Sequence, residues 1–171
     1  RVVNHEVSMP RDLEERERRV EHVSELALEA LQRAKNPLLV NGRASSWSGY
    51  SAWNRWKKDE RNAHSWPQSS DFDAVLMRLF SEKAAMALAL EAVASSMKQG
   101  AELWIVGTND EGIKSWSKRL SPWFEGVETV LFKRHCRLLR AYRSSERDGL
   151  KDTLEAWKEE QLISIGGHEV A

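Results

Sequence analysis

The chain has 171 residues, enough for one domain with a substantial hydrophobic core but short for two. Its 26 Lys and Arg residues are balanced by 26 Asp and Glu residues, so no global charge draws the protein onto nucleic acid, and any RNA contact must come from a local patch. The single cysteine, Cys136, excludes an internal disulfide and suits a reducing intracellular compartment.

No apolar run approaches the roughly 20 residues that cross a bilayer, so we expect no membrane partner. No signal peptide is visible at the start of the chain. The sequence begins at Arg1 without a methionine, which suggests a fragment, a processed protein or an expressed portion of a longer one. We therefore expect an intracellular protein, cytoplasmic or organellar, because a transit peptide could already have been removed.

The first expected element is a helix from 11 to 35, made of strong helix formers. Pro10 suits its start, and Asn36-Pro37 suits its end. The run from 14 to 19 is wholly charged, so we expect the first two turns to project into solvent. A solvated face with ion pairs between residues four apart is favoured there over a partner site.

A short buried strand is predicted over "PLLVNG", Pro37 to Gly42. The segment that follows, residues 43–70, has no periodic pattern and holds several tryptophans among basic residues; we call it the Trp-rich segment. So long a loop in a compact domain usually carries a function or is disordered, and tryptophans argue against disorder. Trp53 and Trp56 could lie on a short helix with a basic outer edge.

The second half of the chain alternates strands and helices. "FDAVLMRL", Phe72 to Leu79, predicts a buried strand, and Ser81 would cap a helix from 82 to about 99. A strand over residues 103–106 and a helix beginning near Glu111 follow. Residues 127–143 predict two strands joined by a turn near 133–136, and residues 148–162 predict a last, charged helix.

Gly107 ends a predicted parallel strand and could belong to a turn that binds a cofactor. Such a turn points its backbone N–H groups at the ligand. The phosphate-binding spacing G-x-G-x-x-G is absent here, and the acidic Asp110 and Glu111 would repel phosphate. A tight structural corner is therefore the favoured interpretation.

The element order is that of the second half of a class I methyltransferase sheet. We predict an α/β fold with an incomplete, Rossmann-like class I methyltransferase sheet, helices on both faces and an antiparallel C-terminal hairpin. The motifs "EGIKS" (Glu111 to Ser115) and "FKRHCRLL" (Phe132 to Leu139) make the likeness more specific. With Gly107 before them, residues 72–142 resemble the N-terminal, non-catalytic domain of the bacterial rRNA guanine-N2 methyltransferases that carry tandem methyltransferase-like domains, in the methyltransferase small domain family.

Two features of a working methyltransferase domain are missing. No G-x-G, which the S-adenosylmethionine site of the class needs after its first strand, occurs in the chain. Where the family has Asn-Pro-Pro and an aromatic residue after its fourth strand, this chain has "LFSE", Leu79 to Glu82. The pair Asn36-Pro37 precedes a strand and lacks the second proline. We therefore assign no catalytic, cofactor-binding or metal-binding residue to this chain.

The resemblance implies a division into an N-terminal helix packing on the domain (1–36), a degenerate methyltransferase-like domain (37–143), and a C-terminal helix with the start of a linker to a catalytic domain (144–171). It further implies that the full-length protein is an S-adenosylmethionine-dependent methyltransferase acting on ribosomal RNA. This chain alone would bind no cofactor and be inactive, and would support RNA binding and folding of the catalytic domain, its partner in the same polypeptide.

Two local patches are candidate RNA contacts, because aromatic stacking and Lys or Arg beside it suit single strands. One lies in the Trp-rich segment, whose tryptophans could equally fill the core or an interface to the catalytic domain. The other is the hairpin turn, where a solvated edge is an equal alternative. The residues we assign are Trp53, Arg55, Trp56, Lys57, Lys58, Arg61, Lys133 and Arg134.

Other sites and functions are weaker. His135 and Cys136 are adjacent but lack convergent metal ligands, and Cys136 lacks the base and pocket of a nucleophile. His168 fits a linker. The alternative function is a stand-alone RNA- or protein-binding scaffold with a degenerate methyltransferase fold; a small-molecule enzyme using the Gly107 turn ranks third. A longer reading frame containing G-x-G and Asn-Pro-Pro motifs would separate the first two.

Overall fold

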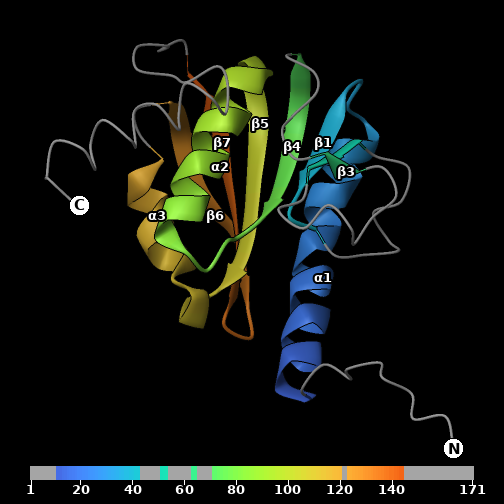
Figure 1. Ribbon diagram of the computed structural model, residues 1–171. Coiled ribbons are helices and arrows are strands. Elements are labelled where there is room, and N and C mark those ends of the chain that lie inside the picture. Colours follow the sequence, from blue (N-terminus) through green and yellow to red (C-terminus); the bar gives the residue numbers. More distant parts are fainter. Residues whose placement is uncertain (1–10, 43–50, 54–62, 65–70, 121–122, 145–171) are drawn as a thin grey trace, which may run out of the picture.

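A computed structural model describes residues 11–42, 51–53, 63–64, 71–120 and 123–144. Three α-helices, one short 3-10 helix and seven strands lie in these residues (Figure 1). In chain order they are α1 (Arg11–Gln32), β1 (Pro37–Val40), β2 (Ser51–Trp53), β3 (Ala63–His64), β4 (Phe72–Arg78), α2 (Lys83–Ser96), β5 (Met97–Thr108), η3 (Asn109–Glu111), α3 (Ile113–Arg119), β6 (Phe124–Lys133) and β7 (Cys136–Arg143).

The strands form one sheet in the order β3-β2-β1-β4-β5-β7-β6. The five strands from β3 to β5 are parallel, and β7 is antiparallel to both β5 and β6. The strand order reverses between β1 and β4, so the carboxyl ends of these two strands flank the switch point of the sheet. In open α/β sheets, ligands bind at such a point.

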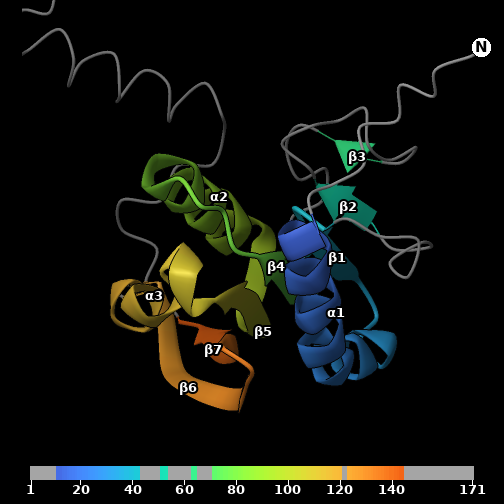
Figure 2. The same cartoon turned by 90° about the horizontal axis from the view of Figure 1, so that it is seen from below.

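Helices cover both faces of the sheet, as the sequence predicts: α1 lies on one face, and α2 and α3 lie on the other (Figure 2). Successive side chains of a strand point to opposite faces, and β4 shows this clearly. Leu76 belongs to the cluster under α1, whereas Val75 and Met77 belong to the cluster under α2 and α3. Full burial of such side chains stabilises the fold by about 1.5–3 kcal/mol each.

The antiparallel hairpin is confirmed, with its turn where the sequence places it. Lys133 and Cys136 are paired across β6 and β7, which leaves Arg134 and His135 as a two-residue loop. Both loop residues have positive φ, 48° and 65°, as in a type I′ turn.

The sheet is more extensive than the sequence predicts, because β2 and β3 come from the Trp-rich segment. Trp53 lies in a strand, so the expected helix through Trp53 and Trp56 is wrong at Trp53. These strands are only three and two residues long and follow no alternating pattern, so sheet pairing rather than local propensity fixes them.

Two boundaries in the second half also differ from expectation. Helix α2 ends at Ser96, and the next strand begins at Met97 rather than after Gly100. Glu82, not Ser81, is the N-cap residue of α2, and it makes no capping bond with its side chain. The helix after β5 is broken at Gly112, whose φ of 86° is left-handed, into η3 and α3.

Candidate functional site at the carboxyl edge of the sheet

The carboxyl ends of β1 and β4 meet at the switch point through two polar residues. Asn41 follows β1 with a φ of 56°, a conformation that asparagine tolerates better than most residues. Its side-chain Nδ2 donates to the backbone carbonyl of Arg78, the last residue of β4, at 3.2 Å. The two strand ends are thus tied together where a ligand of this sheet class would lie.

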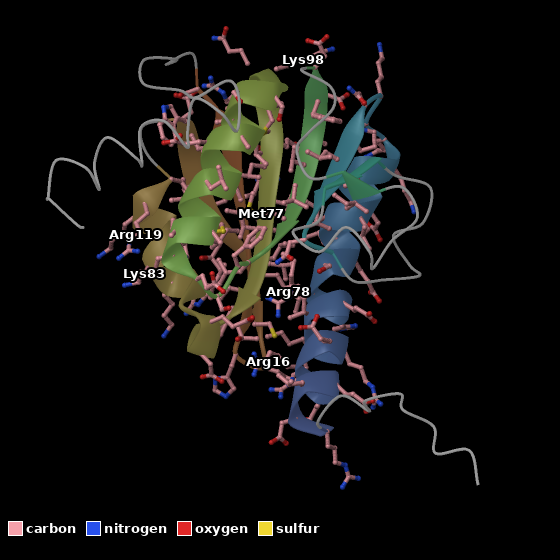
Figure 3. All side chains as sticks on the ribbon, viewed as in Figure 1. Arg16, Met77, Arg78, Lys83, Lys98 and Arg119 are labelled. Atoms are coloured by element: carbon pink, nitrogen blue, oxygen red, sulfur yellow. The ribbon has the colours of Figure 1, made fainter. Side chains whose placement is uncertain are left out.

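Arg78 forms a buried ionic cluster at this edge. Its guanidinium donates two parallel hydrogen bonds of 2.9 Å to the carboxylate of Glu111. It donates a third hydrogen bond, also of 2.9 Å, to the carboxylate of Glu17 on α1. The Arg78 side chain is 8% exposed and that of Glu111 is 11% exposed. Figure 3 shows Arg78 between the end of β4 and α1, with Arg16 below it. We call Glu17, Arg78 and Glu111 the ionic cluster.

The carboxylate of Glu111 has further partners. Its Oε1 accepts bonds from the backbone N–H of Thr108 at 2.9 Å and from the Thr108 hydroxyl at 2.8 Å. Arg16 of α1 approaches its Oε2 at 3.9 Å. The Glu111 carboxylate therefore caps the N-terminus of η3 through Thr108, the last residue of β5. It also links α1 to the sheet through Arg16 and Arg78.

Within the ionic cluster, burial and charge pairing shift the pKa of each group in opposite directions, and the effect of charge pairing is larger. Burial by itself lowers the pKa of Arg78, but its bonds to Glu17 and Glu111 outweigh burial and raise the pKa. Burial by itself raises the pKa of Glu111, but Arg78 and Thr108 outweigh it and lower the pKa. Both groups are therefore ionised at neutral pH, and neither suits proton transfer to a substrate.

The charged first turns of α1 do not simply project into solvent, which corrects the sequence-based expectation. The expected ion pairs do form between Arg18 and Glu14, at 3.8 Å, and between Arg19 and Glu15, at 3.9 Å. Glu17, however, points to Arg78. A buried arginine needs a carboxylate partner, and α1 supplies one because its N-terminal half runs past the carboxyl edge.

The hairpin turn lies beside the same half of α1, and the two form a groove of about 390 Å³. Lys133 Nζ lies 3.2 Å from His22 Nε2, and Arg19 Nη1 donates to the carbonyl of Arg134 at 3.5 Å. We call this the α1–hairpin groove. Its lining residues are Glu15, Arg18, Arg19, His22, Val23, Lys133 and Arg134.

A family profile, "Methyltransferase small domain N-terminal", matches residues 21–160. The chain belongs to this family. The small subunit rRNA methyltransferase C of Marinomonas sp. is 31% identical over 93 residues, which are 53% of this chain and 26% of that relative. The corresponding protein of Shewanella loihica is 31% identical over 101 residues, 59% of this chain and 29% of that relative. The chain thus spans about a quarter of the length of these curated relatives.

Solved structures agree on the class I methyltransferase fold. The guanine-N2 16S rRNA methyltransferase RsmC of T. thermophilus, solved with AdoMet and guanosine, has a TM-score of 0.58 and 16% identity, over 76% of this chain and 41% of that one. The N-methyltransferase NodS of Bradyrhizobium japonicum, solved with S-adenosylhomocysteine, has a TM-score of 0.50 and 13% identity, over 75% of this chain and 87% of that one. These likenesses confirm the predicted fold class, and the family profile confirms the predicted family.

Two hydrogen-bonded contacts occupy the switch point at this edge of the methyltransferase small domain. At the end of β1 the backbone turns through Asn41 and Gly42, and the Asn41 amide is used in the bond to Arg78. At the end of β4, Arg78 is held under α1 by the ionic cluster.

The structure brings together only some of the residues that we predicted to contact RNA. Lys133 and Arg134 are exposed and share the α1–hairpin groove. Trp53 is placed by its backbone, paired with Val40 and His64. The other predicted contacts, Arg55, Trp56, Lys57, Lys58 and Arg61, lie outside the described residues.

Sequence reasoning missed the ionic cluster, although one signal was present. Arg78 interrupts the otherwise apolar run "AVLM-R-LF" of residues 74–80, and a buried charge requires a partner. Its partners, Glu17 and Glu111, lie 61 and 33 residues away in the sequence. The sequence alone does not distinguish them from the other acidic residues, because only the fold brings them to Arg78.

The remaining candidate groups are structural. Gly107 lies within β5, where a Cβ would meet the Cβ of Leu79 at 2.8 Å, so the glycine serves close packing. Burial raises the pKa of the Cys136 thiol, which does not suit a nucleophile. Among the described residues there is no group of three or more potential metal ligands, and no described helix is long and apolar enough to cross a membrane.

Proposed function

We propose that this chain is the non-catalytic N-terminal domain of an S-adenosylmethionine-dependent rRNA guanine-N2 methyltransferase. Three findings support the proposal: membership of the methyltransferase small domain N-terminal family, relatives named rRNA small subunit methyltransferase C, and the class I methyltransferase fold. The domain would aid folding of a catalytic domain in the same polypeptide and help to hold ribosomal RNA. Ribosomal RNA as substrate implies an intracellular location.

The ionic cluster is the observation that carries the non-catalytic part of this proposal. A methyltransferase of this class positions its target amino group at the carboxyl end of the fourth strand, which needs free hydrogen-bond acceptors and space. In this chain the corresponding end is β4, and its terminal Arg78 is bonded to Glu111 and Glu17 beneath α1. The polar groups at this end of β4 are thus bonded to other residues of the chain, which supports a non-catalytic role.

Support for RNA binding comes from the predicted residues that the groove brings together. Lys133 and Arg134 place two cations beside those of α1 on an otherwise electroneutral chain. The basic residues of the Trp-rich segment would add stacking and further phosphate contacts. Ribosomal RNA and the catalytic domain are therefore the proposed partners.

The deciding experiment is calorimetric titration with S-adenosylmethionine of this chain and of the full-length protein, followed by methyl transfer to small subunit rRNA. We expect no heat from this chain, stoichiometric binding by the full-length protein, and methylation only by the latter. Binding by this chain alone would refute the non-catalytic role. Absence of methylation by a folded full-length protein would favour the scaffold alternative.

A matched variant tests the site within the full-length protein. Replacing Leu79 by Ala at the end of β4 alters the position where a catalytic motif would lie, whereas an Ala substitution at the corresponding place of the catalytic domain alters the true motif. We expect the first to change stability and leave the turnover of the folded enzyme unchanged, and the second to abolish turnover. Loss of turnover in a folded Leu79→Ala protein would contradict the proposal.

A further inference from the structure

The α1–hairpin groove is strongly cationic although the chain as a whole is neutral. Four of its seven lining residues are Arg or Lys, and one, Glu15, is acidic. The cations come from two elements more than a hundred residues apart in sequence, the N-terminal half of α1 and the β6–β7 turn. The fold therefore concentrates positive charge that composition does not reveal.

These cations are available to an external anion. In the described part of the chain, Arg18 and Arg19 form ion pairs with Glu14 and Glu15 one helical turn away, at 3.8 Å and 3.9 Å; both glutamates are exposed, and pairs of this kind have a small net energy. Among the described residues no carboxylate forms an ion pair with Lys133 or Arg134. A phosphate entering the groove would thus displace only weak contacts.

The backbone of the turn gives an independent indication of function. Type I′ turns require positive φ at both loop residues and are therefore dominated by Asn-Gly and related pairs. This chain places Arg134 and His135 there, at φ of 48° and 65°. A left-handed conformation costs a non-glycine residue roughly 1–2 kcal/mol. Such strain often marks functional positions, and here it presents an arginine at the mouth of the groove.

A neighbouring hollow limits where an anion can lie. It shares Glu15 and Arg19 with the groove, and its other lining residues are Asp12 and Arg16 of α1, Thr108 and Asp110 near the end of β5, and His135. Its three carboxylates outnumber its two arginines, so a phosphate is favoured in the α1–hairpin groove rather than in this hollow.

We propose that the α1–hairpin groove binds the phosphodiester backbone of an RNA strand, with Lys133 and Arg134 on one side and Arg18 and Arg19 on the other. Phosphate contacts of this kind hold a strand in position without reading its bases. The identification of that RNA as ribosomal rests on the proposed function; the binding of an RNA backbone does not.

The test uses a fluorescently labelled single-stranded RNA fragment of the small subunit rRNA and measures fluorescence anisotropy across a series of salt concentrations. The variants are Lys133→Ala with Arg134→Ala, and separately Arg18→Ala with Arg19→Ala. The matched control, Lys83→Ala with Lys118→Ala, removes two exposed cations from α2 and α3 on the opposite face of the sheet.

Each groove variant should weaken binding several-fold. The slope of log K against log salt should fall in magnitude by about 1.4, because each lost single-strand phosphate contact removes about 0.7. The control should retain the wild-type slope. The proposal is overturned if the wild-type chain does not bind, or if groove and control variants lose affinity equally.

A second variant separates function from folding. Arg134→Asn with His135→Gly installs the loop that a type I′ turn favours, so it should raise the Tm while weakening RNA binding. A raised Tm with unchanged affinity would overturn the groove as an RNA site. Methylation by the full-length protein is measured in parallel: failure of methylation with intact RNA binding contradicts the proposed function alone. Intact RNA binding by the groove variants, with a lowered Tm of the full-length protein, would instead assign the groove to domain docking.

Discussion

Arg78 and Glu111 face each other across the carboxyl ends of β4 and β5, joined by two parallel hydrogen bonds of 2.9 Å each. This fork geometry is the strongest arrangement that an arginine and a carboxylate can form. Glu17 on α1 adds a third hydrogen bond to the Arg78 guanidinium. The ionic cluster thus fixes helix α1 to the carboxyl edge of the sheet.

The first prediction concerns the coupling between Arg78 and Glu111. Either Arg78→Met or Glu111→Gln should lower the free energy of unfolding by about 3–5 kcal/mol, because each removes the bidentate partner of a buried charge and leaves that charge only one other ionic contact, Glu17 for Arg78 and Arg16 for Glu111. In the double variant neither charge remains, and the coupling energy should be about 1–3 kcal/mol. Denaturant unfolding of the four proteins measures it.

A matched cycle on the exposed pair Arg18 and Glu14, with side chains 77% and 49% exposed, should give a coupling of at most about 0.5 kcal/mol. Additive effects at Arg78 and Glu111 would show that the buried pair is not a unit.

The same cluster predicts how stability depends on pH. Folding lowers the pKa of Glu111: burial opposes ionisation, but the bonds from Arg78 and Thr108 outweigh it. A lowered carboxyl pKa stabilises the folded state fully above the unfolded value, about 4.3, and this stabilisation is lost as the pH falls through the folded value. The free energy of unfolding of the wild type should therefore fall more steeply below about pH 5 than that of Glu111→Gln. Parallel curves would contradict this origin of acid sensitivity.

Much of the fold could be predicted from sequence because its signals are local. Local sequence alone predicts three of the elements: the apolar run predicts β4, the helix formers predict α1, and the pattern around the turn at Arg134 predicts the two strands of the hairpin. The short motifs "EGIKS" and "FKRHCRLL" then led to the correct family. Their order along the chain mattered more than any single residue.

What escaped prediction depends on distant partners. Strand β2 is held by pairing with β1 and β3, so nothing in its three residues marks it as a strand. Likewise, Glu17 resembles its charged neighbours in sequence and is distinguished only by the Arg78 guanidinium that the fold brings to it. The groove escaped for the same reason, because half of its charge comes from α1 and half from the hairpin.

Gly107 gives a prediction about packing rather than ligand binding. An added Cβ would lie 2.8 Å from the Cβ and 2.9 Å from the Cδ2 of Leu79, whose backbone N–H donates to the carbonyl of Val106, the residue before Gly107. Gly107→Ala should therefore cost about 1–3 kcal/mol, as overpacking does. Gly100→Asn is the control: its φ is 78° with open space around it, and asparagine tolerates that conformation, so its cost should be small. Thermal unfolding measures both, and equal stability of Gly107→Ala and wild type would contradict the close approach.

The last prediction concerns the basic residues of the Trp-rich segment, which remain proposed RNA contacts. Replacing Arg55, Lys57 and Lys58 together by Ala should weaken RNA binding and reduce the magnitude of its salt slope by about 2, because three single-strand contacts of about 0.7 each would be lost. Combined with Lys133→Ala, the losses should add if the segment and the groove hold different phosphates of one strand. Salt-dependent anisotropy with the same rRNA fragment measures this. Unchanged affinity of the triple variant would leave the groove as the RNA contact and assign the tryptophans to the core or to the catalytic domain.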